Sequence, residues 1–332
     1  MAKLFMLKIT ELLEDAGIDP DPEMKSIILV GGMGTRLKDD RKRIDVSLFN
    51  GMSEKFDGQV GPKGLALLKP SGCDVRPLTD WHLEIHERCT QIEELSLALG
   101  CCADMMEDYY QSCYQMSFNG LRLKTIPEKN PAGTIAPLVK LYSQGKLTDG
   151  VYVYANGDNL ADVDFLQCYR EGMKAALDSK VSTRALVIDI AALVPWEESD
   201  AYGTLDMDFT SGKVSSFKEK GPVESNAWTE VDGRKMTPIN SGFSIIVNPL
   251  SLFDEFLDQE VVDTSLKLEA GELDYKGNET VVKYETFYEK LAANNRMVAV
   301  LHKGYWTDLG TEEKIMAAEE NLPEFFTDDL ED

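Results

Sequence analysis

The chain lacks an excess of positive charge and any long apolar run. Its 332 residues include 34 Lys and Arg against 58 Asp and Glu, a formal net charge of −24. A chain that negative repels a polyanion, so we expect no general binding to nucleic acid. No run approaches the roughly 20 apolar residues of a membrane span, so we expect no membrane partner. A small phosphorylated ligand stays compatible, because a few local cations and a bound metal can dominate one site.

Zinc-site spacings are missing too. The 6 cysteines include no CxxC pair, which disfavours structural zinc. His82 and His86 are spaced to share one helix face, but two ligands alone make no metal site, so we interpret them as packing or surface residues. We expect reduced thiols and a cytoplasmic location.

Residues 1–25 are expected to form a helical extension. Lys8 and Glu11 interrupt the apolar stretch that a signal peptide would need. Gly17 supplies a helix stop. Five apolar residues are expected to lie toward one side of the helix: Leu4, Phe5, Ile9, Leu12 and Leu13. The helix packs against the core or contacts a second subunit, and the sequence leaves both open.

Strand and helix patterns alternate over the rest of the chain, which indicates an α/β fold with a largely parallel sheet. The pattern predicts strands near 27–30, 121–126, 150–158, 185–190, 214–220 and 241–247, and helices near 81–99, 284–294 and 312–321. We assign 26–321 to one domain with a polar insertion at about 38–60, and 322–332 to an acidic tail.

The most informative motif is IILVGGMGTRL at residues 27–37. An apolar run suited to a strand buried on both faces is followed by glycines that let the backbone turn close to a ligand. Backbone N–H groups and an arginine suit a phosphate there. The glycines miss the spacing of the dinucleotide fingerprint and of the P-loop, so an ordinary strand-to-helix turn stays open. The expected phosphate-facing residues are Gly31, Gly32, Gly34, Thr35 and Arg36.

This motif resembles the signature of the sugar-1-phosphate nucleotidyltransferases, the NDP-sugar pyrophosphorylases, in which GGxGTRL is followed by a Pro-Lys pair. Pro62 and Lys63 stand here in GPKGLALL, and similar motifs recur in order from about Ser26 to about Asn321. The resemblance implies a Rossmann-like, GT-A-like three-layer fold with a mixed, mostly parallel central sheet. It also implies an enzyme that joins a nucleoside triphosphate and a sugar 1-phosphate into an NDP-sugar and pyrophosphate.

Nucleotidyl transfer brings anionic groups together, so the protein must supply cations, fixed N–H donors and a divalent metal. The resemblance gives Arg36 and Lys63 the catalytic role of stabilising charge on the α-phosphate and the leaving pyrophosphate. Asp158 follows an apolar strand in VYVYANGDNL, at the kind of strand end where ligands gather, although a turn cap is an alternative. With Asp308 in GYWTDLGT, it is implied to bind Mg²⁺, whose octahedron phosphate oxygens and water would complete.

Sugar-side motifs lie between the two aspartates. AYGTLD resembles the family's YG turn, SFKEKG its EKP element with Gly221 in place of proline, and INSGF its N-x-G turn. Each of these resemblances is weak evidence alone; a Lys-Glu-Lys run, for example, is usually part of a solvated face. The residues implied to bind the sugar phosphate, with Lys220 on the phosphate itself, are Tyr202, Gly203, Glu219, Lys220, Asn240 and Gly242.

The base pocket is expected in EKNPAGTIAPL, which resembles E-x-PLGTAGA. The resemblance places Gly133 against the nucleobase, where a missing side chain permits close approach, and Glu128 near the edge of the base. Ile135 and Ala136 replace the second Ala-Gly step of the family's motif. UTP, dTTP, CTP and GTP therefore all stay open.

Other functions stay open at this stage. The insertion and Gly221 are compatible with a cytidylyltransferase that uses a non-sugar phosphate or phosphonate acceptor. A non-catalytic, nucleotide-sensing regulatory homologue is disfavoured, because a sensor need not keep the metal pair beside Arg36 and Lys63. Assembly into a homo-oligomer is left open.

Overall fold

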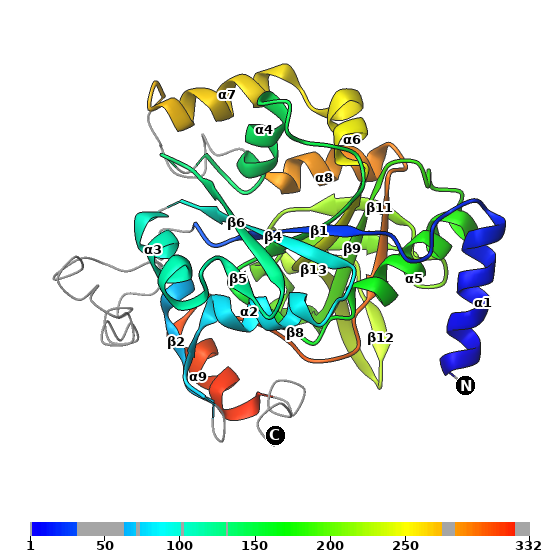
Figure 1. Ribbon diagram of the computed structural model, residues 1–332. Helices are drawn as coiled ribbons and strands as arrows, with labels where there is room; N and C mark the ends of the chain where they lie inside the picture. The colour runs from blue at the N-terminus through cyan, green and yellow to red at the C-terminus, as the bar shows by residue number, and fades with distance from the viewer. Residues whose placement is uncertain are drawn as a thin grey trace.

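A large mixed β-sheet forms the centre of the protein in the computed structural model (Figure 1). The structure describes residues 2–31, 63–70, 74–100, 103–130, 132–273 and 283–322. The central strands run parallel, as expected for strands buried on both faces. In spatial order they are β7 (Val151–Asn156), β1 (Met24–Leu29), β4 (Ile92–Leu99) and β6 (Leu121–Pro127).

Antiparallel strands extend this core around the long strand β13 (Arg234–Val247), which pairs with β7 on one side and with β9 (Leu186–Pro195) on the other. The remaining strands of the sheet are β5 (Ser117–Phe118), β10 (Thr204–Met207), β11 (Val214–Lys218), β12 (Thr229–Val231) and β14 (Met297–Leu301). Two small sheets pair β15 (Trp306–Asp308) with β8 (Asn159–Ala161), and β2 (Leu67–Leu68) with β3 (Arg76–Pro77).

Helices cover both faces of the sheet, so the expected three-layer α/β fold is confirmed (Figure 1). One core cluster includes residues of α1 (Ala2–Asp15), α2 (Leu78–Glu87), α3 (Ala103–Tyr114), α5 (Phe165–Ser179) and α9 (Glu312–Asn321). The other includes residues of α4 (Ala136–Ser143), α6 (Pro249–Phe256), α7 (Gln259–Ala270) and α8 (Tyr284–Ala293). Short 3₁₀ turns lie at Lys63–Leu65, Trp196–Ala201 and Val223–Ser225.

The expected N-terminal helix is present as α1, and Gly17 follows it with φ +71°. Ile9 and Leu13 are buried and the helix packs against α5, so its packing role is confirmed. Leu12 is 38% exposed, and the side chains of Leu4 and Phe5 lie outside the described part of the structure. Tyr169 of α5 donates its hydroxyl to the Asp19 carbonyl at 3.1 Å, which fixes the chain that leaves the helix.

The helix expected at 81–99 is wrong in its second half. The chain is helical over Leu78–Glu87 and then forms β4 at Ile92–Leu99, between β1 and β6. Leu95, Leu97 and Leu99 alternate toward one core cluster, a period-2 pattern that indicates a strand. Pairing with two distant strands therefore outweighed the helical propensity of the segment.

The other expected elements are present, with their ends shifted by a few residues. His82 and His86 are fully buried in α2 against the rings of Phe243 and Phe165, which confirms a packing role. Burial lowers their pKa values to about 4 and about 3. Cys89, Cys113 and Cys168 are free thiols. Among the helices that the structure describes, none combines the length and apolar character of a bilayer span.

Candidate active site

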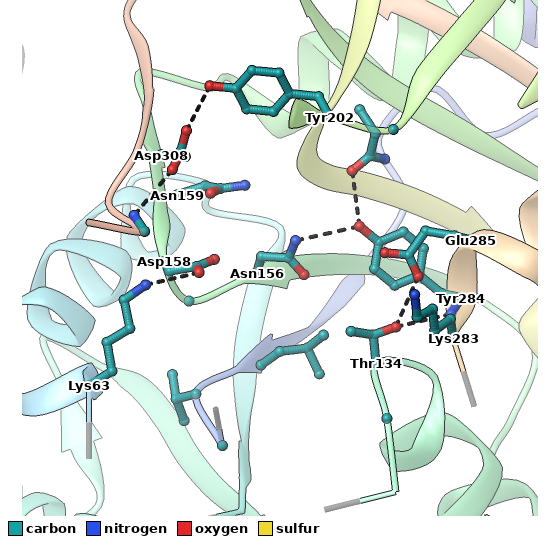
Figure 2. A pocket seen from close by; sticks show the side chains of 18 of the residues that line it. Lys63, Thr134, Asn156, Asp158, Asn159, Tyr202, Lys283, Tyr284, Glu285 and Asp308 are labelled. Atoms are coloured by element: carbon teal, nitrogen blue, oxygen red, sulfur yellow. Dashed lines mark hydrogen bonds and ion pairs between the residues drawn. The ribbon is translucent and has the colours of Figure 1, made fainter. Parts of the chain in front are cut away.

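A cavity of about 650 Å³ lies at the carboxyl ends of β1 and β7 (Figure 2). Such strand ends are where open α/β sheets bind ligands. The cavity gathers predicted site residues from across the chain: Gly31, Lys63, Glu128, Gly133, Asp158, Tyr202, Gly203, Glu219, Lys220, Asn240 and Asp308. Four more predicted residues, Gly32, Gly34, Thr35 and Arg36, lie outside the described residues, as do Pro62 and the insertion at 38–60.

Gly31 follows the end of β1, at a point where two backbones nearly touch. A Cβ at this position would lie 2.4 Å from the Gly100 nitrogen and 2.8 Å from its Cα, closer than any side chain can fit. Glycine is therefore required for β1 and β4 to end side by side. Because Gly31 lines the cavity and has no side chain, it exposes only backbone there, which suits a ligand that is recognised through N–H groups.

Asp158 and Asp308 come together because β8 and β15 pair. Asp308 lies opposite Asn159 in that pair, and the Leu309 N–H donates to the Asp158 carbonyl at 2.6 Å. Lys63 Nζ lies 3.0 Å from Asp158 Oδ2, and the Tyr202 hydroxyl donates to Asp308 Oδ2 at 2.9 Å (Figure 2). Lys314 of α9 forms an ion pair with the same Asp308 oxygen.

These two carboxylates fit a Mg²⁺ ion and not a self-contained metal cage. Over the described ranges, no group of three or more His, Cys, Asp and Glu side chains could hold a metal. Mg²⁺ is usually bound by one or two carboxylates together with substrate phosphates and water. Asp158 and Asp308 meet that requirement if a triphosphate supplies the remaining oxygens.

Asn240 enters the cavity from an irregularity in β13. The register between β13 and β9 shifts between Asn240 and Phe243. Gly242 has φ +85°, and a Cβ there would lie 1.8 Å from Asn159 Nδ2, so this predicted residue shapes the turn behind the cavity. Asn240 Oδ1 accepts from the Gly242 N–H at 2.9 Å and from the Tyr284 hydroxyl at 3.0 Å.

A buried carboxyl group is hydrogen-bonded to the amide nitrogen of Asn240. Asn240 Nδ2 donates to Asp189 Oδ2 on the neighbouring strand β9. Asp189 is fully buried, and burial raises the pKa of its carboxyl group to about 8. With both sides of the amide hydrogen-bonded, the orientation of Asn240 is defined before any ligand arrives.

The remaining sugar-side residues line the same part of the cavity. Glu219 lies 3.6 Å from Lys283 Nζ, while Lys220 is exposed at the cavity edge. Tyr202 packs edge-on against Trp306, whose indole N–H donates to the Ser241 carbonyl at 2.8 Å. An aromatic and polar wall of this kind suits a hydroxylated ring.

The predicted base residues also line the cavity, after β6. The Glu128 N–H donates to the Leu99 carbonyl at 2.6 Å, and its side chain is buried. Burial, and to a lesser extent the carboxylate of Glu269, raises the pKa of Glu128 to about 8. Gly133 follows with φ +121°. Glu128 and Gly133 therefore line the same cavity, as expected.

A family model described as nucleotidyl transferase matches residues 101–324, more than half of the chain. The chain belongs to this nucleotidyl transferase family. The predicted resemblance is thereby confirmed, as is the class of enzyme. The matched region holds both aspartates and every predicted sugar-side residue.

Relatives in this family include two proteins named D-glycero-alpha-D-manno-heptose 1-phosphate guanylyltransferase. The one from Aneurinibacillus thermoaerophilus is 26% identical over 201 residues, 60% of this chain and 68% of that protein. The one from Campylobacter jejuni is 26% identical over 237 residues, 71% of this chain and 81% of that protein. A crystal structure of UDP-glucose pyrophosphorylase with UDP-glucose covers 89% of this chain and 97% of its own, with TM-score 0.55 and 15% identity. That likeness establishes the nucleotidyltransferase fold.

Sequence reasoning missed three residues that the structure adds to the site: Lys314, Asp189 and Tyr284. Thr311 accepts a hydrogen bond from the Lys314 N–H at 3.4 Å as the N-cap of α9. Threonine is a favoured N-cap residue, so Thr311 could have indicated that a helix begins here with Lys314 in its first turn. Asp189 was visible as a lone acid inside an apolar strand. Nothing local to Tyr284 signals that its hydroxyl reaches Asn240.

Proposed function

We propose that this nucleotidyltransferase transfers the nucleotidyl group of a nucleoside triphosphate to a sugar 1-phosphate, with Mg²⁺, to give an NDP-sugar and pyrophosphate. The observation that carries the proposal is the position of Asp158 and Asp308. They lie side by side in one cavity, with glycine backbone on the side of β1 and β4 and polar side chains on the side of β13. Two anionic ligands can meet only where their charge is neutralised.

The acceptor phosphate attacks the α-phosphorus while the bond to the leaving pyrophosphate breaks. No general base is required, because the attacking phosphate oxygen is already anionic. Lys63 would hold a phosphate oxygen, Lys220 would hold the acceptor phosphate, and Asn240 would fix the sugar ring. Mg²⁺, when bound by Asp158 and Asp308, supplies neutralisation of the phosphate oxygens. Positioning and electrostatics then account for the acceleration.

GTP is the nucleotide that we propose, on two grounds. In its ionised form, which is favoured above its raised pKa of about 8, Glu128 accepts a hydrogen bond from the ring N–H of guanine or uracil, while adenine and cytosine present a bare acceptor nitrogen at that edge. The heptose 1-phosphate relatives are named guanylyltransferases, which favours guanine over uracil. The same names make a heptose 1-phosphate the first acceptor to test.

The test is pyrophosphate release from each of four nucleoside triphosphates against a panel of sugar 1-phosphates, with Mg²⁺ or with EDTA. We expect release that requires GTP, a sugar 1-phosphate and Mg²⁺ together. Release with a phosphonate or non-sugar phosphate acceptor alone would replace the proposed substrate. No release in any combination, with bound nucleotide detected by calorimetry, would favour a sensor and contradict the proposal.

A further inference from the structure

Both proposed metal ligands are neutralised by a lysine in the ligand-free protein. Lys63 Nζ pairs with Asp158 Oδ2 at 3.0 Å, and Lys314 pairs with Asp308 Oδ2. Lys63 belongs to the Pro-Lys motif, whereas Lys314 belongs to none of the motifs in the sequence. Lys314 thus has a place in the site without an assigned role.

Each carboxylate oxygen of Asp308 already accepts a hydrogen bond from a described residue, and Oδ2 accepts two. Oδ2 accepts from the Tyr202 hydroxyl at 2.9 Å and from Lys314, and Oδ1 accepts from the Gly310 N–H at 3.1 Å. Lys314 Nζ also donates to the Tyr202 oxygen at 3.0 Å. A cation that binds Oδ2 must therefore displace a donor, and of the two donors the Lys314 ammonium is the one that repels it.

The two lysines differ in how easily each can move away from its aspartate. The side chain of Lys63 is 12% exposed, whereas that of Lys314 is 40% exposed. Lys314 can move into solvent-filled space at small cost, and a partly exposed ion pair is weak. Once displaced, its charge stays beside Tyr202 on the acceptor side of the cavity, where an anionic phosphate would balance it.

We propose that Lys314 is an exchangeable counterion that occupies Asp308 in the metal-free enzyme and binds the phosphate of the acceptor when Mg²⁺ takes Asp308. Entry of the metal then creates part of the acceptor site, so the two binding events are coupled. This inference rests on the proposed function, because it assumes a metal at Asp308 and a phosphorylated acceptor.

Lys314→Gln separates this role from a structural one. Without the competing ammonium, Mn²⁺ alone should bind the nucleotide-free protein about 3- to 5-fold more tightly, as expected for a partly exposed ion pair. The KM for the acceptor should rise about 10-fold, because a charged hydrogen bond to phosphate is lost. If Lys314 only supported the fold, its replacement would weaken both Mn²⁺ binding and acceptor binding. Lys314→Arg should retain most of the acceptor affinity.

Lys290→Gln is the matched control. Lys290 lies on α8, its side chain is 38% exposed, and its Nζ pairs with Asp258 Oδ1 at 2.7 Å. Neither residue lines the cavity. Lys290→Gln should change neither the affinity for Mn²⁺ nor the KM for the acceptor. Free Mn²⁺ is counted by electron paramagnetic resonance, with Asp308→Asn to identify the site. The counterion role is overturned if wild type, Lys314→Gln and Asp308→Asn bind Mn²⁺ equally tightly. It is also overturned if Lys314→Gln leaves the KM for the acceptor unchanged. In both cases the proposed function stands as long as the wild type turns over. Absence of turnover in the wild type overturns the proposed function itself.

Discussion

The two halves of the cavity are built from different material. The half that we propose to bind the nucleotide lies at the parallel strands β1, β4 and β7, each followed within two residues by a glycine, so part of its wall is glycine backbone. The half that we propose to bind the acceptor lies beside antiparallel strands, at Tyr202, Glu219 and Asn240. A substitution cannot move a backbone group unless the fold changes, whereas a substitution can replace a side chain without moving a strand. We infer that the acceptor can be altered far more readily than the chemistry of the triphosphate.

The largest expected effect comes from the aspartates, which both halves share. Asp158→Asn and Asp308→Asn should each lower kcat on the order of 10³-fold, about 4 kcal/mol of lost stabilisation, because phosphate charge is no longer neutralised. Steady-state kinetics with saturating substrates measures the loss, and circular dichroism checks the fold. Retained turnover in either variant would remove that residue from the metal site.

Gly157→Ala tests the backbone half. A Cβ at Gly157 would lie 2.7 Å from the Leu29 carbonyl oxygen and 2.7 Å from Val30 Cγ1. We expect a loss of about 1–3 kcal/mol in unfolding free energy, with a raised KM for the nucleotide, measured by urea unfolding and kinetics. Gly221→Ala is the control, because the nearest atom to its added Cβ is 3.7 Å away. Equal effects of the two substitutions would break the contrast between the halves.

Asn240→Ala tests the side-chain half. Removal of the amide should raise the KM for the sugar phosphate about 10-fold or more and leave the nucleotide KM within about 2-fold. Tyr202→Phe, which removes a hydroxyl from Asp308, should have a smaller effect on the acceptor. A parallel rise in both KM values would mean that the halves do not bind separately.

A further expected effect is on the pH dependence of stability. The pKa of Asp189 is raised from 3.8 to about 8 in the fold, so between those values the folded state binds more protons than the unfolded one. The free energy of unfolding should therefore fall as pH rises from about 4 to 8. Asp189→Asn should make this fall shallower in urea unfolding between pH 5 and 8. An unchanged slope would show that Asp189 is ionised in the fold.

Local patterns predicted much of the parallel core and of the site. Apolar runs sufficed for β1 and β7, because strands buried on both faces need no partner information to be recognised. β4 was missed, since its pairing with β1 and β6 decided its structure. Asp189 and Lys314 were missed as site residues because their roles follow from contacts with Asn240 and Asp308 that no spacing rule specifies. The domain limits remain predictions.

The central claim is that both substrates meet at the paired aspartates, and label transfer tests it most directly. The protein is incubated with α-³²P-labelled GTP, a sugar 1-phosphate and Mg²⁺, and the products are separated by chromatography. We predict that the label moves into an NDP-sugar in the wild type, returns to GTP when pyrophosphate is added, and stays in GTP with Asp158→Asn. Label that enters no sugar nucleotide from any nucleoside triphosphate, or enters one equally well with Asp158→Asn, would contradict the claim.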